Sequence, residues 1–187
     1  MGLAPEALAR LLEVIEPTSP DNPWGGVYTR ERNALIVKWL LSTGIRRGEL
    51  AGVRVSDINF QMNELLIARR ADDPADPRKY QPNTKTNDRL IPLDDDLSEL
   101  TRRYIFGARK AIKGARRSEY LFVAQGTGAP LSMSAINKIF DSLRRRCPEL
   151  PDDLHPHITR HTCNDILSEV MDKKQVSEEM EIKMRSR

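Results

Sequence analysis

The sequence predicts a mainly helical α+β domain that carries one small, three-stranded antiparallel sheet. Apolar residues recur at helical spacing in several separate segments, and short β-prone runs are confined to the middle of the chain. A length of 187 residues, with 39% hydrophobic and 30% charged side chains, suits one soluble domain with its own core. We expect residues 1–172 to form this domain and residues 173–187 to form a charged tail or helix whose packing partner is missing.

The N-terminal third is expected to be helical. Residues 5–15 repeat their leucines on one face, and Pro5 is an allowed first helical residue. Thr29 is the expected N-cap of a second helix, which Gly44 closes. A short third helix is expected over residues 46–51.

The sheet is expected in the middle of the chain. Residues 64–69 and 89–93 are short β-prone runs bounded by turn residues. The connection between them is polar and rich in Asp, Pro and Asn, and it contains Lys85. An antiparallel arrangement with a long connection follows from this order.

The C-terminal half returns to helices. Asp94 or Asp95 is the expected N-cap of a helix that continues to Ile112. Ser132 or Ser134 is expected to open the next helix. The last helix is expected to begin at residue 155 or 156 and to bury one apolar stripe, which consists of Cys163, Ile166, Leu167 and Val170.

Composition favours a cytoplasmic protein that does not enter a membrane. The longest apolar run, residues 34–41, is interrupted by Lys38 and is too short to cross a bilayer. No basic and then apolar leader opens the chain. Two cysteines, Cys147 and Cys163, are too few for a disulfide framework, so reduced thiols are expected.

Positive charge is concentrated in one third of the sequence. Residues 100–147 hold eleven Lys or Arg and two Asp or Glu, a balance of +9, whereas the rest holds nineteen basic and twenty-five acidic residues, a balance of −6. This contrast favours a side that faces a polyanion such as nucleic acid. A solvated basic helix is the alternative explanation.

The first group of chemically informative residues spans 43–50. Gly44 ends one helix, and Arg46 follows at the start of the next, where free backbone N–H groups and a guanidinium can share one anion. Glu49, three residues later, is close enough to pair with an arginine. A helix corner with surface arginines and an ordinary charge pair is the alternative.

The second group spans 84–93, where Lys85 precedes a β-prone run. Lysine is a flexible cation that can donate a proton, which arginine effectively cannot do. Lys79 is a rival for the same role, and a merely solvated turn lysine is the alternative.

The third group spans 155–162 and contains all three histidines. His157, Arg160 and His161 are spaced to share one helical face. A histidine pair at this spacing can bind zinc, which would suit a metal-dependent hydrolase, but the cation Arg160 within the group opposes a metal. The histidines could also cap the helix, or contact DNA without taking part in catalysis.

These three groups together resemble one family. Tyrosine recombinases and phage integrases carry a Thr-Gly-hydrophobic-Arg-x-x-Glu-Leu block, a lysine ahead of an Ile-Pro-Leu-like strand, and a His-x-x-Arg-His block. The resemblance covers about residues 29–170, and the joint order is more specific than any single block. It implies the helical catalytic domain of this family, with its small sheet, acting on double-stranded DNA in site-specific recombination or integration.

The resemblance implies a role for each matching residue. Arg46 and Arg160 would clamp the scissile phosphate, Lys85 would protonate the leaving 5′ oxygen, and His157 would transfer a proton near the nucleophile. Phosphoryl transfer depends mainly on positioning and charge stabilisation, so this set suits the chemistry without a metal or cofactor.

Further residues are expected to support these four. Glu49 would steady the arginines, and His161 would be a neighbour of the phosphate. We also expect four arginines to contact DNA, namely Arg47, Arg144, Arg145 and Arg146. The family implies assembly as a tetramer on DNA, while a monomer suits the isolated chain.

The sequence departs from the family pattern in two places. The family's nucleophilic tyrosine follows its His-x-x-Arg block, whereas the four tyrosines here, Tyr28, Tyr80, Tyr104 and Tyr120, all precede Arg160. The family's N-terminal core-binding domain has no counterpart either. The sequence therefore predicts a truncated recombinase that is inactive alone, with a non-catalytic DNA-binding module or degenerate remnant as the alternative.

Overall fold

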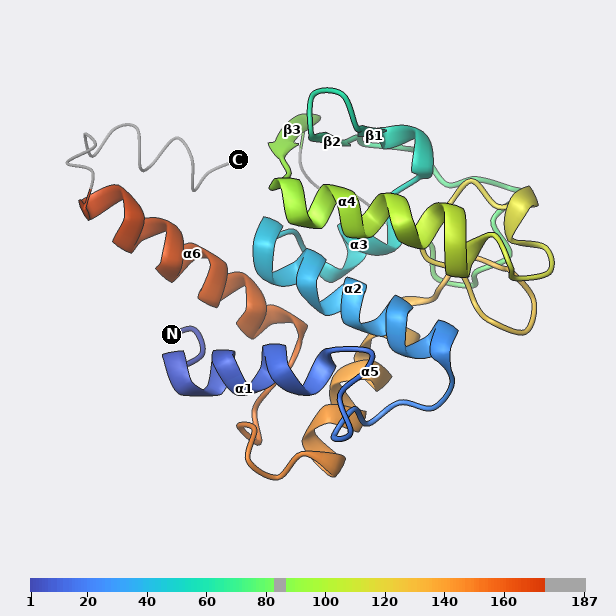
Figure 1. Ribbon diagram of the computed structural model, residues 1–187. Coiled ribbons are helices and arrows are strands. Elements are labelled where there is room, and N and C mark those ends of the chain that lie inside the picture. The colour runs from blue at the N-terminus through green and yellow to red at the C-terminus, as the bar shows by residue number, and fades with distance from the viewer. Residues whose placement is uncertain (83–86, 174–187) are drawn as a thin grey trace.

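The computed structural model describes residues 1–82 and 87–173, which form six α-helices and a three-stranded sheet (Figure 1). This confirms the mainly helical α+β fold class. In chain order the elements are α1 (Pro5–Ile15), α2 (Val27–Thr43), α3 (Arg47–Gly52), β1 (Ile58–Asn59), β2 (Glu64–Ile67), β3 (Arg89–Pro92), α4 (Asp95–Tyr104), α5 (Met133–Arg146) and α6 (Pro156–Lys173). Short helical turns occupy Val55–Asp57, Ile105–Arg109 and Ala115–Arg117.

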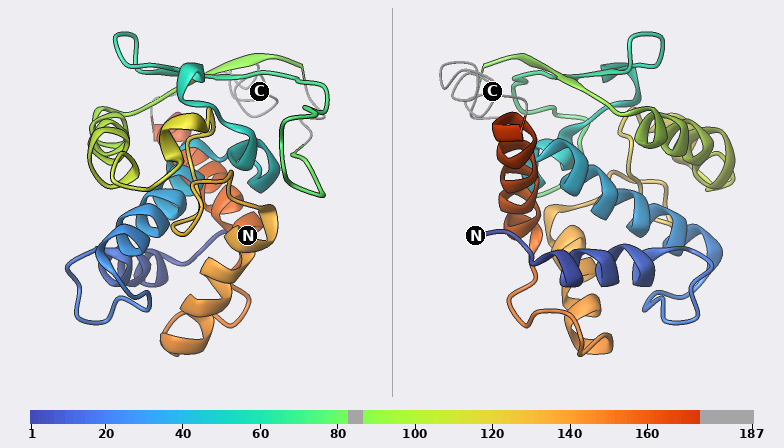
Figure 2. Two further views of the ribbon diagram at one scale, coloured as in Figure 1. Left: turned by 90° about the vertical axis from the view of Figure 1, so that its right-hand side faces the viewer. Right: turned by 60° about the vertical axis from the view of Figure 1, so that its left-hand side comes forward.

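Helix α2 is the centre of the fold. It contacts α1, α3, α4 and α6, and most of its length is buried (Figures 1 and 2). Trp39 is fully buried, and its indole N–H donates to the Thr101 hydroxyl of α4 over 2.9 Å. A helix that is buried on all sides belongs to the core rather than to the surface.

The start of α2 differs from the prediction. The helix begins at Val27 with Gly26 as its N-cap, so Thr29 lies inside the first turn and is not the cap. The Thr29 hydroxyl instead donates to the side chain of Gln125 over 2.9 Å. The Thr29 side chain, which the local sequence predicted to cap the helix, therefore bonds to a residue distant in sequence.

The sheet runs in the order β1-β2-β3 and is antiparallel throughout. Leu65 and Ile67 of β2 are buried against the helices, whereas Leu66 is exposed. Ile67 pairs directly with Arg89 of β3. Directly paired residues share a face, so this register directs Arg89 toward the inner face of the sheet.

The region after α4 also differs from the prediction. The α-helix ends at Tyr104 and passes into a π-helical turn over Ile105–Arg109, so it does not continue to Ile112. Arg109 is buried and donates to the backbone carbonyls of Ser118, Tyr120 and Leu121 over 2.7–3.0 Å. This arginine of the basic stretch therefore stabilises the interior and does not face a ligand.

The buried face of α6 is not the predicted one. Ile158, Thr159, Thr162 and Met171 are buried, whereas Ile166 and Val170 are exposed. The N-terminal segment lies beside α6, and the N–H of Leu3 donates to the Thr162 hydroxyl over 2.8 Å (Figure 2). Contacts with this segment and with α2 select the face that is covered. In the part of the chain that the structure describes, no helix is both long and apolar enough to cross a membrane.

Candidate functional site

A cleft of about 800 Å³ lies between α3, α5 and the start of α6. It brings the first and third predicted groups together, although more than a hundred residues separate them in sequence. Its polar lining consists of Arg46, Arg47, Glu49, Asn137, Asp141, Arg144, His155, His157 and Arg160.

The turn at Gly44 determines how the two groups meet. Gly44 closes α2 in the left-handed region, with φ of 61°, as the sequence predicts. Its carbonyl accepts a hydrogen bond from Nη1 of Arg160 over 2.6 Å. A Cβ at this position would lie 3.1 Å from Sγ of Cys163, so α6 approaches the turn closely. Glycine is therefore required both for the turn and for the docking of α6.

Replacing Gly44 with alanine is expected to destabilise the protein by about 1–2 kcal/mol, because a side chain disfavours the left-handed region. The close contact with Cys163 should also displace Arg160 and weaken anion binding. Chemical denaturation and sulfate titration measure the two effects. Gly107→Ala is the matched control, since its added Cβ meets nothing within 4 Å and its φ is not positive; an equal loss in both variants would contradict the expectation.

Glu49 fixes the arginine at the start of α3. One of its oxygens, Oε2, accepts from the backbone N–H of Arg46 over 2.8 Å, and the other, Oε1, lies 3.4 Å from Nη1 of Arg46. The side chain of Glu49 is only 3% exposed, whereas that of Arg46 is 53% exposed. The guanidinium of Arg46 is therefore accessible from the cleft while its backbone is held.

Arg89 is a residue of this site that the sequence did not reveal. Its Nη2 lies 3.0 Å from Oε2 of Glu49, and its side chain is almost fully buried. Burial raises the pKa of Glu49, but the hydrogen bonds from Arg89 and from the Arg46 backbone outweigh it and lower the pKa below its ordinary value. Glu49 is therefore ionised at neutral pH. The sequence offered one signal, a charged residue at the head of a β-prone run.

Arg160 lies in a positively charged environment. Burial is the main factor that lowers its pKa, and the charge of Arg46 lowers it further, while Glu49 opposes the shift. An arginine stays protonated under these conditions, so the cost of the crowded positive charge persists. An anion in the cleft would relieve this cost, which makes the site suitable for a phosphate.

His157 is poised to be neutral. Loss of hydration lowers its pKa first, and the charges of His161, His155 and the two arginines lower it further. Its ring meets that of His161 edge to face at 4.6 Å. A neutral imidazole can accept a proton at neutral pH. Among the described residues, no three His, Cys, Asp or Glu side chains are arranged to hold a metal ion.

The pKa of His157 predicts a pH effect. A histidine with a lowered pKa binds its proton more weakly in the folded protein than in the unfolded chain. Its contribution to stability is therefore full above its ordinary pKa and decreases as pH falls below that value. We expect a small decrease in Tm between about pH 7.5 and 5.5, which sulfate should offset. His157→Gln should remove this decrease, and persistence of the full decrease in that variant would contradict the assignment.

The predicted DNA-contacting arginines are not gathered in one place. Nη1 of Arg47 donates to Asn137 over 2.5 Å, and Nη1 of Arg144 donates to the Leu154 carbonyl over 2.6 Å; both arginines line the cleft. Arg145 and Arg146 do not line it, and Arg146 donates to the Pro23 carbonyl over 2.7 Å. His161 is exposed beside the cleft. The predicted role of Lys85 concerns a position outside the described residues, and its rival Lys79 is exposed beside the ring of Tyr80.

None of the four tyrosines lines the cleft. Tyr28 and Tyr104 are buried with their hydroxyls 3.3 Å apart, and burial strongly raises the pKa of Tyr104. The hydroxyl of Tyr120 donates to Asp76 over 3.1 Å. Tyr80 is exposed on the long connection between β2 and β3.

The fold and the site define a mainly helical domain in which two arginines, a buried glutamate and a histidine line one open cleft, a set of side chains whose charge suits a phosphate. Comparison with known sequences identifies the family. The model of the phage integrase family matches residues 3–181, so the chain belongs to that family. This confirms the resemblance that the three sequence groups indicated.

Curated relatives are tyrosine recombinases. The chain is 27% identical over 134 residues to the tyrosine recombinase XerC of Lacticaseibacillus casei, which covers 71% of this chain and 40% of that protein. It is 28% identical over 134 residues to the tyrosine recombinase XerA of Saccharolobus solfataricus, covering 71% of this chain and 35% of that protein. The matches thus span less than half the length of these relatives.

Solved structures share the fold. The integrase of transposon Tn1549, in complex with a circular intermediate DNA, matches with a TM-score of 0.74 at 20% identity, over 100% of this chain and 58% of that one. A XerA recombinase matches with a TM-score of 0.63 at 21% identity, over 89% of this chain and 49% of that one. The fold is therefore the one that recombinase structures contain.

Proposed function

We propose that this chain binds double-stranded DNA and positions a scissile phosphate for a tyrosine-type site-specific recombinase. The observation that carries the proposal is the convergence of Arg46, His157 and Arg160 on one cleft. Membership of the phage integrase family and the DNA present in a similar solved structure support the same conclusion.

The cleft residues, together with Lys85, would serve the stages of strand cleavage. Arg46 and Arg160 would bind the non-bridging oxygens and stabilise the charge that develops on them. A tyrosine hydroxyl would attack phosphorus, pass its proton to the neutral His157, and form a 3′-phosphotyrosine as the bond to the 5′ oxygen breaks. Lys85 would protonate that leaving oxygen, a step typically worth about 10²–10⁴ in rate. Rejoining reverses these transfers.

The nucleophile is proposed to come from outside these 187 residues. The four tyrosines in the sequence are buried with partners or lie away from the cleft lining. These residues alone would then bind DNA without forming a covalent link to it. Assembly into a tetramer on DNA, and action in the cytoplasm, are further parts of the proposal.

Fluorescence anisotropy with a labelled duplex tests the proposal. Binding should weaken as salt rises, with a log–log slope of about −2 to −4 if two to four cleft cations contact phosphates. A denaturing gel should show no protein–DNA adduct. Absence of duplex binding at low salt would refute the proposed function, and an adduct formed by these residues would refute the external nucleophile.

A non-catalytic DNA-binding module is the second candidate, and the placement of the tyrosines favours it. The reading frame beyond Arg187 distinguishes the two candidates. An in-frame tyrosine there that restores adduct formation supports the recombinase. Chelator-sensitive hydrolysis would instead support a hydrolase built on the three histidines.

A further inference from the structure

Arg89 contacts Glu49, a residue of the cleft lining, from the inner face of the sheet. Its strand partner Ile67 is buried, and the Arg89 side chain is only 9% exposed. From β3 the guanidinium meets the carboxylate of Glu49 on α3, with Nη2 and Oε2 3.0 Å apart. The sheet and the arginine-bearing helix are thereby joined through one buried ion pair.

Among the residues that the structure describes, two cations neighbour the carboxylate of Glu49, and they differ in burial and distance. Arg89 is buried with it at 3.0 Å, whereas the guanidinium of Arg46 is about half exposed and 3.4 Å away. A buried carboxylate requires a nearby positive charge, and the closer, better desolvated partner contributes most. Of these two, Arg89 therefore contributes more to the neutralisation, and the charge of Arg46 stays available to an anion in the cleft.

We propose that Arg89 is a positioning residue that neutralises Glu49 and so frees the Arg46 guanidinium to bind a phosphate. This inference rests on the proposed function, since it assigns Arg89 a task in the same site. Without Arg89, the ionised carboxylate of Glu49 would draw Arg46 onto itself. This reduces the positive charge that the cleft offers to DNA.

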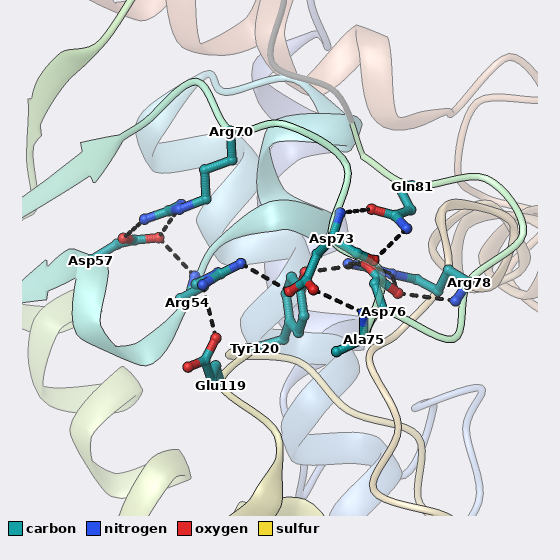
Figure 3. A network of polar contacts seen from close by, with 10 residues as sticks. All are labelled: Arg54, Asp57, Arg70, Asp73, Ala75, Asp76, Arg78, Gln81, Glu119 and Tyr120. Atoms are coloured by element: carbon teal, nitrogen blue, oxygen red, sulfur yellow. Dashed lines mark hydrogen bonds and ion pairs between the residues drawn. The ribbon is translucent and has the colours of Figure 1, made fainter.

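The protein contains a second unit of the same design, which serves as an internal comparison (Figure 3). The backbone N–H of Arg54 donates to Asp57, three residues later, over 2.8 Å, and Arg70 pairs with that buried aspartate. Arg54 occupies the position that Arg46 has in the first unit, but its guanidinium is paired with two further carboxylates, those of Glu119 at 2.8 Å and Asp73 at 3.4 Å. None of these five residues lines the cleft.

The comparison provides matched variants. Arg89→Met removes the buried partner of Glu49, and Arg70→Met removes the partner of the buried Asp57. Only Glu49 also holds an arginine of the cleft, Arg46. We expect Arg89→Met to weaken duplex binding about tenfold and to reduce the salt slope by about one, as the loss of one phosphate contact would. Arg70→Met should leave the affinity and the slope unchanged. Arg89→Lys, which keeps the charge, should recover most of the affinity.

Three results would overturn the proposal. These are a wild-type salt slope in Arg89→Met, an equal loss of affinity in Arg70→Met, and a loss in Arg89→Lys as large as in Arg89→Met. If Arg89→Met does not fold, Arg89→Lys tests the proposal by itself. A complete loss of duplex binding in the folded lysine variant would contradict neutralisation of Glu49 by a positive charge at position 89. If the wild-type protein binds no duplex, the proposed function fails separately. The rise of Tm with inorganic sulfate, larger in the wild type and in Arg89→Lys than in Arg89→Met, then tests Arg89 alone.

Discussion

Replacing Asp76 with alanine is expected to destabilise the protein by about 3–5 kcal/mol, because it leaves a buried guanidinium without its counter-charge. The side chains of Asp76 and Arg78 are 0% and 5% exposed and pair through Nη2 and Oδ2 at 2.7 Å. Tyr120 covers the pair, and its ring lies 4.4 Å from the Arg78 guanidinium (Figure 3). Urea denaturation at neutral pH measures the loss.

Asp73 provides the control for this variant. It belongs to the same connection between β2 and β3, but its pair with Arg54 spans 3.4 Å and is partly exposed. Partly exposed pairs are worth about 0–1 kcal/mol, so Asp73→Ala should cost much less than Asp76→Ala. Similar losses in the two variants would show that burial of the Asp76–Arg78 pair does not set its contribution.

The buried pair also explains how a long polar connection acquires a fixed shape. Nη1 of Arg78 donates to the carbonyls of Ala51 and Leu131 over 2.7 and 3.0 Å, which ties the connection to the end of α3 and to the segment before α5. Composition alone marked this stretch as a polar connection. Its anchors are residues distant in sequence, so no local pattern could reveal them.

Local chemistry accounts for the parts of the fold that the sequence predicted well. Asp94 and Ser132 accept hydrogen bonds from the backbone N–H groups of Leu97 and Ala135, as expected of N-caps. Gly44 adopts the left-handed conformation expected after α2. Each of these features depends on residues within four positions, which is the range that sequence patterns report.

Tertiary contacts account for the parts that were missed. Arg89 and Arg109 have the same residue type as the solvated arginines around them, yet both are buried with specific partners. The stripe predicted for α6 was wrong because periodicity identifies an apolar face without identifying which neighbour covers the helix. Ile166 is exposed, while Thr162 is buried beneath the N-terminal segment.

The candidate site residues were predicted from the order of their motifs along the sequence, which carries no information on the distances between them. Arg46, Glu49, His157 and Arg160 were singled out because their motifs occur in a family order, and the structure places all four in the lining of one cleft. Their proposed roles remain predictions. The DNA contacts expected of four further arginines also remain predictions; Arg47 and Arg144 line the cleft, and Arg145 and Arg146 do not.

Replacing Arg160 with methionine is expected to weaken duplex binding about 10- to 100-fold. Its guanidinium has two tasks, since Nη1 is held by the Gly44 carbonyl at 2.6 Å and the remaining donors can bind phosphate. A charge-assisted hydrogen bond contributes about 1.5–3 kcal/mol, which corresponds to this range. Arg160→Lys should restore little, because one ammonium cannot reach the carbonyl and also bind two phosphate oxygens. Anisotropy at fixed salt measures all three proteins.

Arg103→Met separates this effect from a change in net charge. Arg103 is exposed on α4, and α4 contributes no residue to the cleft lining. The variant loses the same single charge, so it should bind the duplex within about twofold of the wild type at moderate salt. Equal losses of affinity in Arg103→Met and Arg160→Met would mean that duplex binding depends only on the net charge of the protein. That result would contradict the assignment of the cleft as the phosphate site. If Arg160→Lys retains the affinity, a positive charge at position 160 is sufficient. The orientation of the guanidinium by the Gly44 carbonyl is then not needed for binding.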